Sequence, residues 1–331
     1  MAAKSSRIAV VLGAGGVLGA AWMAGALAAL QERLARPIGS ADLIVGTSAG
    51  SILAAALRCG VGVDEIVAHQ RGAPLVALPR LTDLDRGSGA WPPLPRMRIG
   101  SPRLLVSSAL APHRVHPWVA ASALILQGRG QHGSLTTLLD ALLANDASGL
   151  AGTWPERADT WVMAVDYQSG RRVAFGRPGA PAAALPDAVV ASCSIPGWYE
   201  PKIIGGRRYI DGGVRSTTSL DLLARAGLDE VYVLAPMASY DLDNPFNPPA
   251  RIERLFRRFV TAALTQEVQK VRAAGTQVTV LTPGREDLAA IGANMMDPAR
   301  RQTVLETSLG TSRAILAALP DGPLPDGPLA A

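Results

Sequence analysis

Short apolar segments alternate with longer helix-like segments along most of the chain. The segments that predict buried strands are residues 7–12, 42–45, 160–165, 207–210, 230–235 and 277–281. The segments that predict helices are residues 20–34, 48–58, 186–194, 220–226, 251–274 and 298–319. Short apolar strands separated by helices are typical of a mainly parallel sheet that is covered on both faces. We therefore expect a three-layer α/β/α sandwich with a mainly parallel central sheet.

The first part of the chain allows two interpretations. Lys4 and Arg7 precede an uncharged run from Ile8 to Leu30, which by hydropathy alone fits a signal peptide or a membrane span. Four glycines within residues 13–19 are unfavourable at the centre of a helix. These glycines favour a strand, a glycine loop and a buried helix, with a targeting segment as the alternative.

Residues 71–130 differ from the rest of the chain in charge. They contain two tryptophans and two aspartates together with eight arginines, which are Arg71, Arg80, Arg86, Arg96, Arg98, Arg103, Arg114 and Arg129. One interpretation is a solvated insertion with one or two helices. The other is a lid that meets an anionic lipid surface, with arginines on phosphates and Trp91 and Trp118 at the interface. We expect no nucleic acid as partner, because no nucleic-acid motif accompanies the charge.

The remaining composition bounds the domain organisation and the compartment. We expect residues 1–319 to form one domain with 71–130 as a basic insertion, and the Pro- and Gly-rich residues 320–331 to form a disordered tail. Two cysteines, Cys59 and Cys193, make no disulfide framework and fit a reducing compartment. The expected location is cytoplasmic, with contact at the membrane surface if the insertion is a lid.

Residues 46–50 (Gly-Thr-Ser-Ala-Gly) lie where a predicted strand meets a predicted helix. A serine between small residues, with glycines two positions to either side, is the pattern of a nucleophile elbow. The turn would expose the Ser48 hydroxyl above the sheet and place the Ala49 N–H at a helix N-terminus. Glycine-rich turns of this kind also occur without chemistry, so the motif needs supporting residues.

A glycine loop at residues 13–19 follows the first strand and opens a helix, which presents backbone N–H groups to an anion. The dinucleotide fingerprint fails because Leu18 occupies the position of its last glycine. A P-loop would need Gly-Lys-Ser/Thr, which is absent from the sequence. We therefore expect the N–H groups of Gly15, Gly16 and Ala49 to hold the oxyanion of a reaction at Ser48.

A serine hydrolase also needs a base, and the histidines are poor candidates. An α/β-hydrolase has its histidine after the acidic residue, but the chain has none beyond residue 132; the histidines are His69, His113, His116 and His132. We expect all of them at the surface or in loops. Asp211 ends a predicted strand and precedes two glycines. Asp-Gly is a common turn, but a carboxylate at the C-terminal end of a strand would share a rim with Ser48.

Together these motifs resemble the patatin-like acyl hydrolases. Residues 13–19 resemble the family's oxyanion motif, 46–50 its nucleophile elbow and 211–213 its Asp-Gly-Gly motif. Residues 191–196 (Ala-Ser-Cys-Ser-Ile-Pro) are similar to the stretch that precedes that aspartate, and order and approximate spacing agree over residues 7–235. The glycines that would support these motifs are Gly13, Gly19, Gly46, Gly50, Gly212 and Gly213.

The resemblance implies a patatin-like fold and a serine acyl hydrolase of the phospholipase A, lysophospholipase or lipase type, with a Ser48–Asp211 dyad. The substrate would be a lipid or another acyl ester, and no cofactor or metal is implied. Leu18 stands where most bacterial and plant members carry Arg or Lys, whereas animal triglyceride-lipase relatives also carry leucine. Preference for a charged head group therefore stays open. The alternatives are a phosphate- or nucleotide-binding module with Ser48 as a helix cap, and an inactive member of the family.

Overall fold

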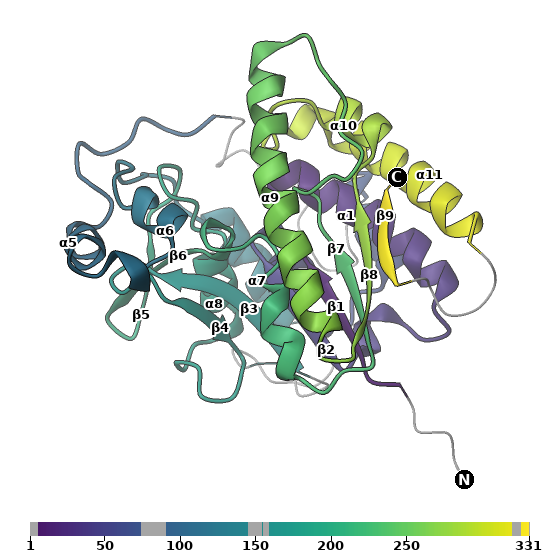
Figure 1. The fold of residues 1–331 in the computed structure, drawn as a ribbon, viewed down its shortest axis with the longest axis horizontal. Helices are drawn as coiled ribbons and strands as arrows, with labels where there is room; N and C mark the ends of the chain where they lie inside the picture. The colour runs from purple at the N-terminus through teal and green to yellow at the C-terminus, as the bar shows by residue number, and fades with distance from the viewer. Residues whose placement is uncertain (1–5, 74–90, 145–153, 155–158, 320–325, 331) are drawn as a thin grey trace.

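The computed structural model describes residues 6–73, 91–144, 154, 159–319 and 326–330. Their strands form one sheet in the order β5-β6-β3-β2-β1-β7-β8-β9, with β4 paired to β3 (Figure 1). The strands are β1 (Ile8–Leu12), β2 (Leu43–Thr47), β3 (Asp159–Asp166), β4 (Arg172–Phe175), β5 (Lys202–Ile204), β6 (Arg207–Asp211), β7 (Glu230–Leu234), β8 (Gln277–Thr282) and β9 (Gly327–Ala330). The run from β3 to β9 is parallel, and β4, β5 and β6 add an antiparallel edge.

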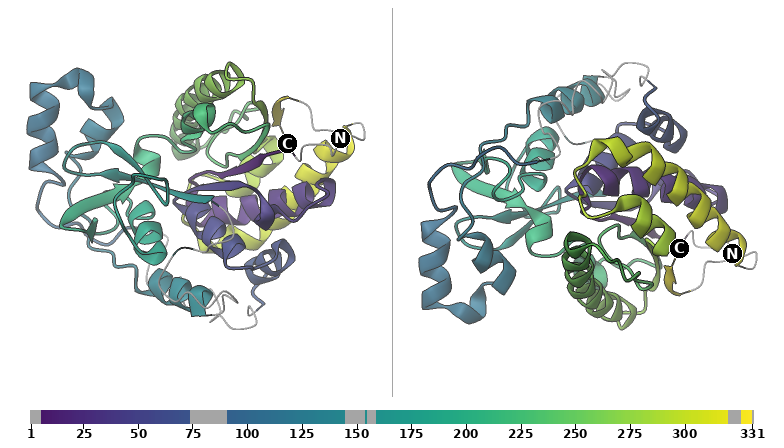
Figure 2. Two further views of the ribbon diagram at one scale, coloured as in Figure 1. Left: turned by 90° about the horizontal axis from the view of Figure 1, so that it is seen from below. Right: turned by 90° about the horizontal axis from the view of Figure 1, so that it is seen from above.

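Helices cover both faces of the sheet (Figures 1 and 2). The helices are α1 (Gly16–Arg33), α2 (Ala49–Arg58), α3 (Val63–Gln70), α5 (Pro102–Leu110), α6 (Pro117–Ser122), α7 (Gly133–Ala144), α8 (Leu185–Ser192), α9 (Pro248–Arg272), α10 (Arg285–Ile291) and α11 (Arg301–Ala317). Alternate side chains of β1 point to opposite layers: Val10 and Leu12 pack with α1, α2 and α8, whereas Ala9 and Val11 pack with α9. The expected three-layer α/β/α sandwich with a mainly parallel sheet is confirmed.

The glycine loop is shorter than the sequence indicates, because α1 begins at Gly16 and not near residue 20. Glycines inside this helix allow close packing. A Cβ on Gly25 would lie 2.7 Å from the backbone nitrogen of Leu309 in α11. The Ser308 hydroxyl donates to the Trp22 carbonyl at 2.7 Å across the same contact. Residues 8–33 therefore form a central strand and a buried helix, as the first interpretation predicts.

The basic segment is described over residues 71–73 and from residue 91 onward, and its second part carries α5, the 3₁₀ turn η3 (Pro112–Arg114) and α6. It packs against β3 and β6 through a small apolar cluster that includes Leu104, Val119, Tyr167 and Ile210. Tyr167 adds a hydrogen bond from its hydroxyl to the Ser122 carbonyl at 2.7 Å. Arg80, Arg86 and both aspartates of the segment lie outside the described residues.

The C-terminal end differs from the expected disordered tail. Residues 327–330 form β9, which pairs in parallel with β8. The Asp326 carboxylate explains this order, since it accepts hydrogen bonds from Arg272 and from the Val278 N–H, both at 2.8 Å. Residues 320–325 and 331 lie outside the described part of the chain. Among the helices that the structure describes, none is both long and apolar enough to cross a membrane.

Candidate active site

Ser48 occupies a strained turn between β2 and α2. Its φ of 52° and ψ of −122° are unusual for a residue other than glycine, and such conformations cluster at functional sites. A Cβ on Gly46 would lie 2.5 Å from the Ser51 Cα, and one on Gly50 would lie 2.0 Å from the Leu12 carbonyl oxygen. The Ser48 side chain makes no capping hydrogen bond to α2. This geometry fits the elbow and disfavours a simple helix cap.

Ser192, in the last turn of α8, holds this elbow in place. Its hydroxyl oxygen accepts the Ser48 N–H at 2.8 Å and donates to the Met163 carbonyl at 2.6 Å. Ser192 is fully buried, so both bonds are made in the protein interior. The resemblance marked residues 191–196 as a motif but gave Ser192 no role; the structure supplies that role.

Asp211 reaches the same place from the opposite direction. The expectation that the C-terminal end of its strand shares a rim with Ser48 holds for a parallel strand, but β6 is antiparallel to β3. The register explains why the aspartate still lies beside Ser48: Thr47 is level with Met163 of β3, and Asp211 is level with the next residue, Ala164. The end of β6 therefore meets the C-terminal end of β2. The expected proximity holds, although the assumed strand direction was wrong.

The Asp211 carboxyl is buried, and it is close enough to the Ser48 hydroxyl for that hydroxyl to lower the pKa of Asp211. Its Oδ1 also accepts the Gly213 N–H at 2.7 Å. Burial raises the pKa of Asp211 to about 6, and the Ser48 hydroxyl and the Gly213 N–H oppose that rise. A carboxyl with a pKa near neutrality can both accept and return a proton at physiological pH.

The glycine loop faces the same space as Ser48 and Asp211. Gly13, Ala14 and Leu18 donate their N–H groups to the carbonyls of Leu234, Thr217 and Met295 at 2.8–2.9 Å. Gly15 and Gly16, between these anchored positions, line the cavity that contains Ser48 and Asp211. Gly16 has a φ of +59°, and a Cβ there would lie 2.7 Å from the Met296 sulfur, so the position requires glycine.

The histidines are only partly as expected. His113 is exposed, and His116 and His132 lie in loops immediately before α6 and α7, but His69 is buried in α3, contrary to the expectation. His132 lines the same cavity as Ser48. The His132 Nε2 is 3.3 Å from the Ser194 hydroxyl, and its ring stacks on Tyr199 with centroids 4.1 Å apart. Burial lowers the pKa of His132 to about 4.

Cys193 also lies next to the nucleophile, with its sulfur 3.9 Å from the Ser51 hydroxyl. Burial and the charge of Asp211 raise the pKa of the Cys193 thiol far above its usual value. Because the thiolate is the reactive form of cysteine, this residue is not a rival nucleophile.

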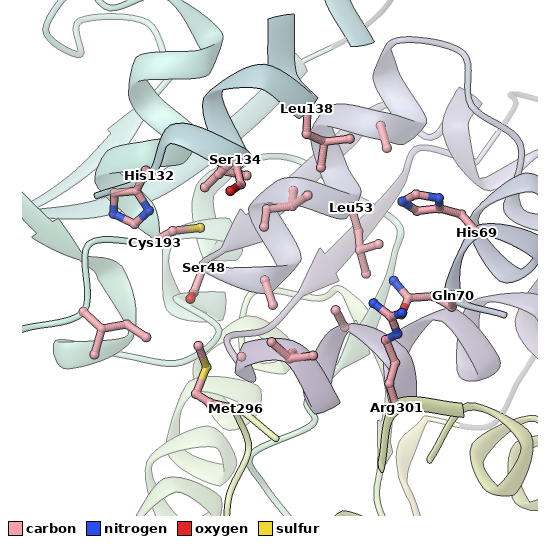
Figure 3. Close-up of a pocket in the computed structure, with 18 of the residues that line it drawn as sticks. Ser48, Leu53, His69, Gln70, His132, Ser134, Leu138, Cys193, Met296 and Arg301 are labelled. Carbon is pink, nitrogen blue, oxygen red and sulfur yellow. The ribbon is translucent and has the colours of Figure 1, made fainter. Parts of the chain in front are cut away.

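Two cavities meet at Ser48. The smaller, of about 190 Å³, is lined mainly by apolar side chains of α1, α2, α3 and α7, among them Val17, Ile52, Leu53, Ile66 and Leu138. Figure 3 shows Ser48 at one end of it and His69, Gln70 and Arg301 at the other. A cavity of about 150 Å³ can hold benzene, so this one suits a short stretch of hydrocarbon.

The larger cavity has a volume of about 960 Å³ and lies on the other side of the serine. It contains Ser48 and Asp211 together with Gly15 and Gly16 of the glycine loop. Apolar side chains of α6 and α9 line it, among them Trp118, Phe256 and Phe259. Charged and polar side chains also line it, among them His116, Arg215, Asp221, Glu267 and Lys270.

A strained serine at a strand-to-helix turn, beside a buried carboxyl on an α/β/α sandwich, is the arrangement of a serine hydrolase. The family model for the patatin-like phospholipases matches residues 10–224. The chain belongs to this family, which places it among the lipid acyl hydrolases.

Two solved structures are similar in fold. VipD from Legionella pneumophila aligns with a TM-score of 0.44 and 13% identity, over 96% of this chain and 67% of that one. The type III effector protein ExoU aligns with a TM-score of 0.37 and 16% identity, over 94% of this chain. The chain covers 52% of ExoU, about half of its length. No curated protein matches the sequence.

Proposed function

We propose that the protein is a serine esterase that hydrolyses acyl esters of lipids through a Ser48–Asp211 dyad. The observation that carries the proposal is the position of the strained Ser48 beside the buried Asp211 carboxyl in one cavity, where the Ser48 hydroxyl lowers the pKa of Asp211. Asp211 takes the proton of the Ser48 hydroxyl, and the Ser48 Oγ forms a bond to the acyl carbonyl carbon.

The N–H groups of Gly15, Gly16 and Ala49 hold the oxyanion that develops. One such donor contributes about 3–4 kcal/mol of transition-state stabilisation in other hydrolases. As the ester C–O bond breaks, Asp211 returns its proton to the leaving alcohol. A water molecule then attacks the acyl-serine as Asp211 takes one of its protons. The ester bond to the Ser48 Oγ breaks, Asp211 returns the proton to that oxygen, and the fatty acid leaves.

The two cavities suggest how the substrate lies. The apolar cavity beside Ala49 and Leu53 takes the acyl chain, because hydrocarbon gains free energy when it leaves water. The larger cavity beside Asp211 takes the alcohol portion of the ester. Asp211 then lies on the side of the leaving group, where its proton is needed.

Release of fatty acid from esters tests this function. Wild-type protein should hydrolyse dihexanoylglycerol with one fatty acid released per ester cleaved, and Ser48→Ala should release none. Thr47→Ser, next to the nucleophile, serves as the control variant and should keep most of the activity. Equal turnover by wild type and Ser48→Ala would refute the dyad, and no turnover by wild type would favour an inactive or binding protein.

Contact with an anionic membrane is a second element of the proposal. Trp118 packs edge-on against Phe256 and Phe259, with ring centroids 6.5 and 6.3 Å apart, at the wall of the larger cavity. These three aromatic side chains are 40–54% exposed, and Trp91 is 78% exposed. Aromatic side chains at an interface and arginines near lipid phosphates both favour membrane binding.

Vesicle binding tests this element. Arg96 forms an ion pair with Glu200 at 2.5 Å, so the test replaces Arg98 and Arg103 with glutamine. Wild-type protein should bind anionic vesicles better than neutral ones, with less binding as salt rises, and the double variant should lose about 1 kcal/mol per arginine. Equal binding to both kinds of vesicle would remove the electrostatic argument.

A further inference from the structure

Arg215 is a cationic side chain of the larger cavity, and its guanidinium has no direct partner among the described residues. Arg215 follows the 3₁₀ turn η4 (Gly212–Val214) and is four positions after Asp211. It is half-buried and lines the larger cavity together with Ser48 and Asp211. Within the residues that the structure describes, its guanidinium makes no hydrogen bond or ion pair.

Two carboxylates whose charges act on Arg215 line the same cavity, and both already have direct partners. Asp221 accepts both hydrogen bonds of a bidentate pair with Arg172, at 2.7 and 2.8 Å. Glu267 accepts hydrogen bonds of 2.6–2.9 Å whose donors are the Ser216 and Thr218 hydroxyls and the Leu220 N–H. A guanidinium that is partly removed from water without a direct partner is unfavourable, and an anionic ligand would compensate for that loss.

His116 lines the same cavity at the start of α6. Its Nδ1 is buried and has no hydrogen-bond partner among the described residues. Burial, followed by the charges of Arg215 and Arg172, lowers the pKa of His116. The imidazole is therefore neutral at physiological pH, and one of its ring nitrogens can donate to an oxygen of the ligand.

We propose that Arg215 and His116 form a binding site for the phosphoryl group of the substrate, so that phospholipids are preferred over uncharged acylglycerols. This inference rests on the proposed function. The planar guanidinium offers two parallel donors that match two phosphate oxygens. Leu18 is fully buried and cannot supply a cation from the glycine loop, whereas Arg215 supplies one from the other side of the dyad. Lys270 lies on the same cavity wall and adds positive charge, but its side chain is exposed and less restricted than that of Arg215.

The test compares dihexanoyl phosphatidylcholine, kept monomeric, with dihexanoylglycerol, which has the same acyl chains and no phosphate. Arg215→Gln should lower kcat/KM for the phospholipid about 10- to 100-fold, the value of a charge-assisted hydrogen bond. The same variant should change hydrolysis of dihexanoylglycerol by less than about twofold, because no phosphate contact is lost. Arg215→Lys should recover part of the loss, and His116→Ala should show a smaller selective loss.

Arg225→Gln is the matched control, since Arg225 is exposed in the 3₁₀ turn η5 (Leu220–Arg225) and does not line the cavity. This variant should keep the wild-type ratio of the two activities. An equal loss on both lipids in Arg215→Gln, or no loss on either, would overturn the phosphoryl site while leaving the dyad intact.

Binding of inorganic phosphate separates a lipid head group from a free anion as the source of the phosphoryl group. Competitive inhibition of dihexanoylglycerol hydrolysis by phosphate in wild type, lost in Arg215→Gln, supports the site for either source. Preference for the phospholipid without inhibition by phosphate restricts it to lipids. If wild type hydrolyses neither ester, the proposed function fails, and calorimetric binding of phosphate to wild type and Arg215→Gln still decides whether the site exists.

Discussion

The two cavities that meet at Ser48 differ in chemistry and in the parts of the fold that build them. The smaller lies among α1, α2, α3 and α7 and is mainly apolar near the serine. The larger lies toward α6 and α9 and contains Asp211, Arg215 and other polar groups. An ester is likewise asymmetric, with a hydrocarbon acyl chain on one side and an oxygen-rich alcohol on the other. An ester can therefore be oriented by its two unlike ends, each in contact with a different cavity wall, before Ser48 attacks the carbonyl between them.

The largest expected effect removes the base that both sides share. Asp211→Asn should lower kcat/KM for every ester about 100- to 10,000-fold, the usual contribution of general-base catalysis. Charged and uncharged substrates should suffer alike, because the proton transfer is common to both. Steady-state hydrolysis of two esters measures this, and a loss confined to one substrate would mean that Asp211 binds the substrate and is not its base.

A second change should separate the two cavities. Leu53→Trp fills the apolar cavity, and forced overpacking of this kind costs about 1–3 kcal/mol. Hydrolysis of an octanoyl ester should therefore fall about 10- to 100-fold, whereas an acetyl ester should lose little. Leu255→Trp, at a half-exposed position on α9 outside both cavity linings, is the control. An equal loss on both esters would place the acyl chain elsewhere.

The pKa of Asp211 predicts how activity depends on pH. Only the ionised carboxylate accepts a proton, so kcat/KM should rise with pH and level off above an apparent pKa of about 6. Below that value the rate should fall about tenfold per pH unit. Asp211 titrates between about pH 5 and about pH 7. A wild-type pH profile that stays flat over this interval would contradict the assignment.

The same shift predicts a change in stability. Since the folded-state pKa of Asp211 is above its unfolded value, ionisation destabilises the fold as pH rises from about 4 to about 6. Asp211→Asn should therefore be more stable than wild type above pH 6, by up to about 3 kcal/mol for a shift of about two units. This advantage should vanish below about pH 4, where the carboxyl is protonated in both the folded and the unfolded state. Urea unfolding at two pH values checks it.

Ser192→Ala should lower activity less than Asp211→Asn, and by the same factor for phospholipid and acylglycerol. The variant leaves the buried Ser48 N–H without its acceptor, which costs about 1–3 kcal/mol of stability. The elbow should become less well fixed, so kcat should fall while the ratio of activities on phospholipid and acylglycerol stays unchanged. A selective loss on one substrate would show that Ser192 acts on a cavity and not on the nucleophile.

The smallest effect is expected from His132, which lines the apolar cavity together with Ser48. The His132 Nε2 is in contact with Ser194 and its ring stacks on Tyr199, while burial lowers its pKa to about 4, which makes it a weaker base than Asp211. His132→Gln should therefore retain activity within about threefold of wild type, far less than the 100-fold or greater loss expected for a base. A loss as large as that of Asp211→Asn would replace the dyad with a histidine-based mechanism.

The sequence identified the parts of the site that depend on local pattern. Ser48 and its flanking glycines are recognisable because a strand-to-helix turn leaves no room for larger residues at 46 and 50. The direction of β6 was not recognisable, because antiparallel and parallel strands carry the same apolar pattern. Contacts between distant residues also left no local signal: the bond from Ser48 to Ser192 spans 144 positions. Likewise, Asp326 orders the C-terminal end through Val278, 48 positions earlier.

The central claim is that Ser48 is the nucleophile, and intact mass after reaction with a fluorophosphonate tests it most directly. The strained turn and the neighbouring Asp211 carboxyl predict one adduct on wild-type protein and none on Ser48→Ala. Asp211→Asn, which keeps the serine and loses its base, should label much more slowly. An adduct on Ser48→Ala of the same mass and at the same rate as on wild type would contradict the account.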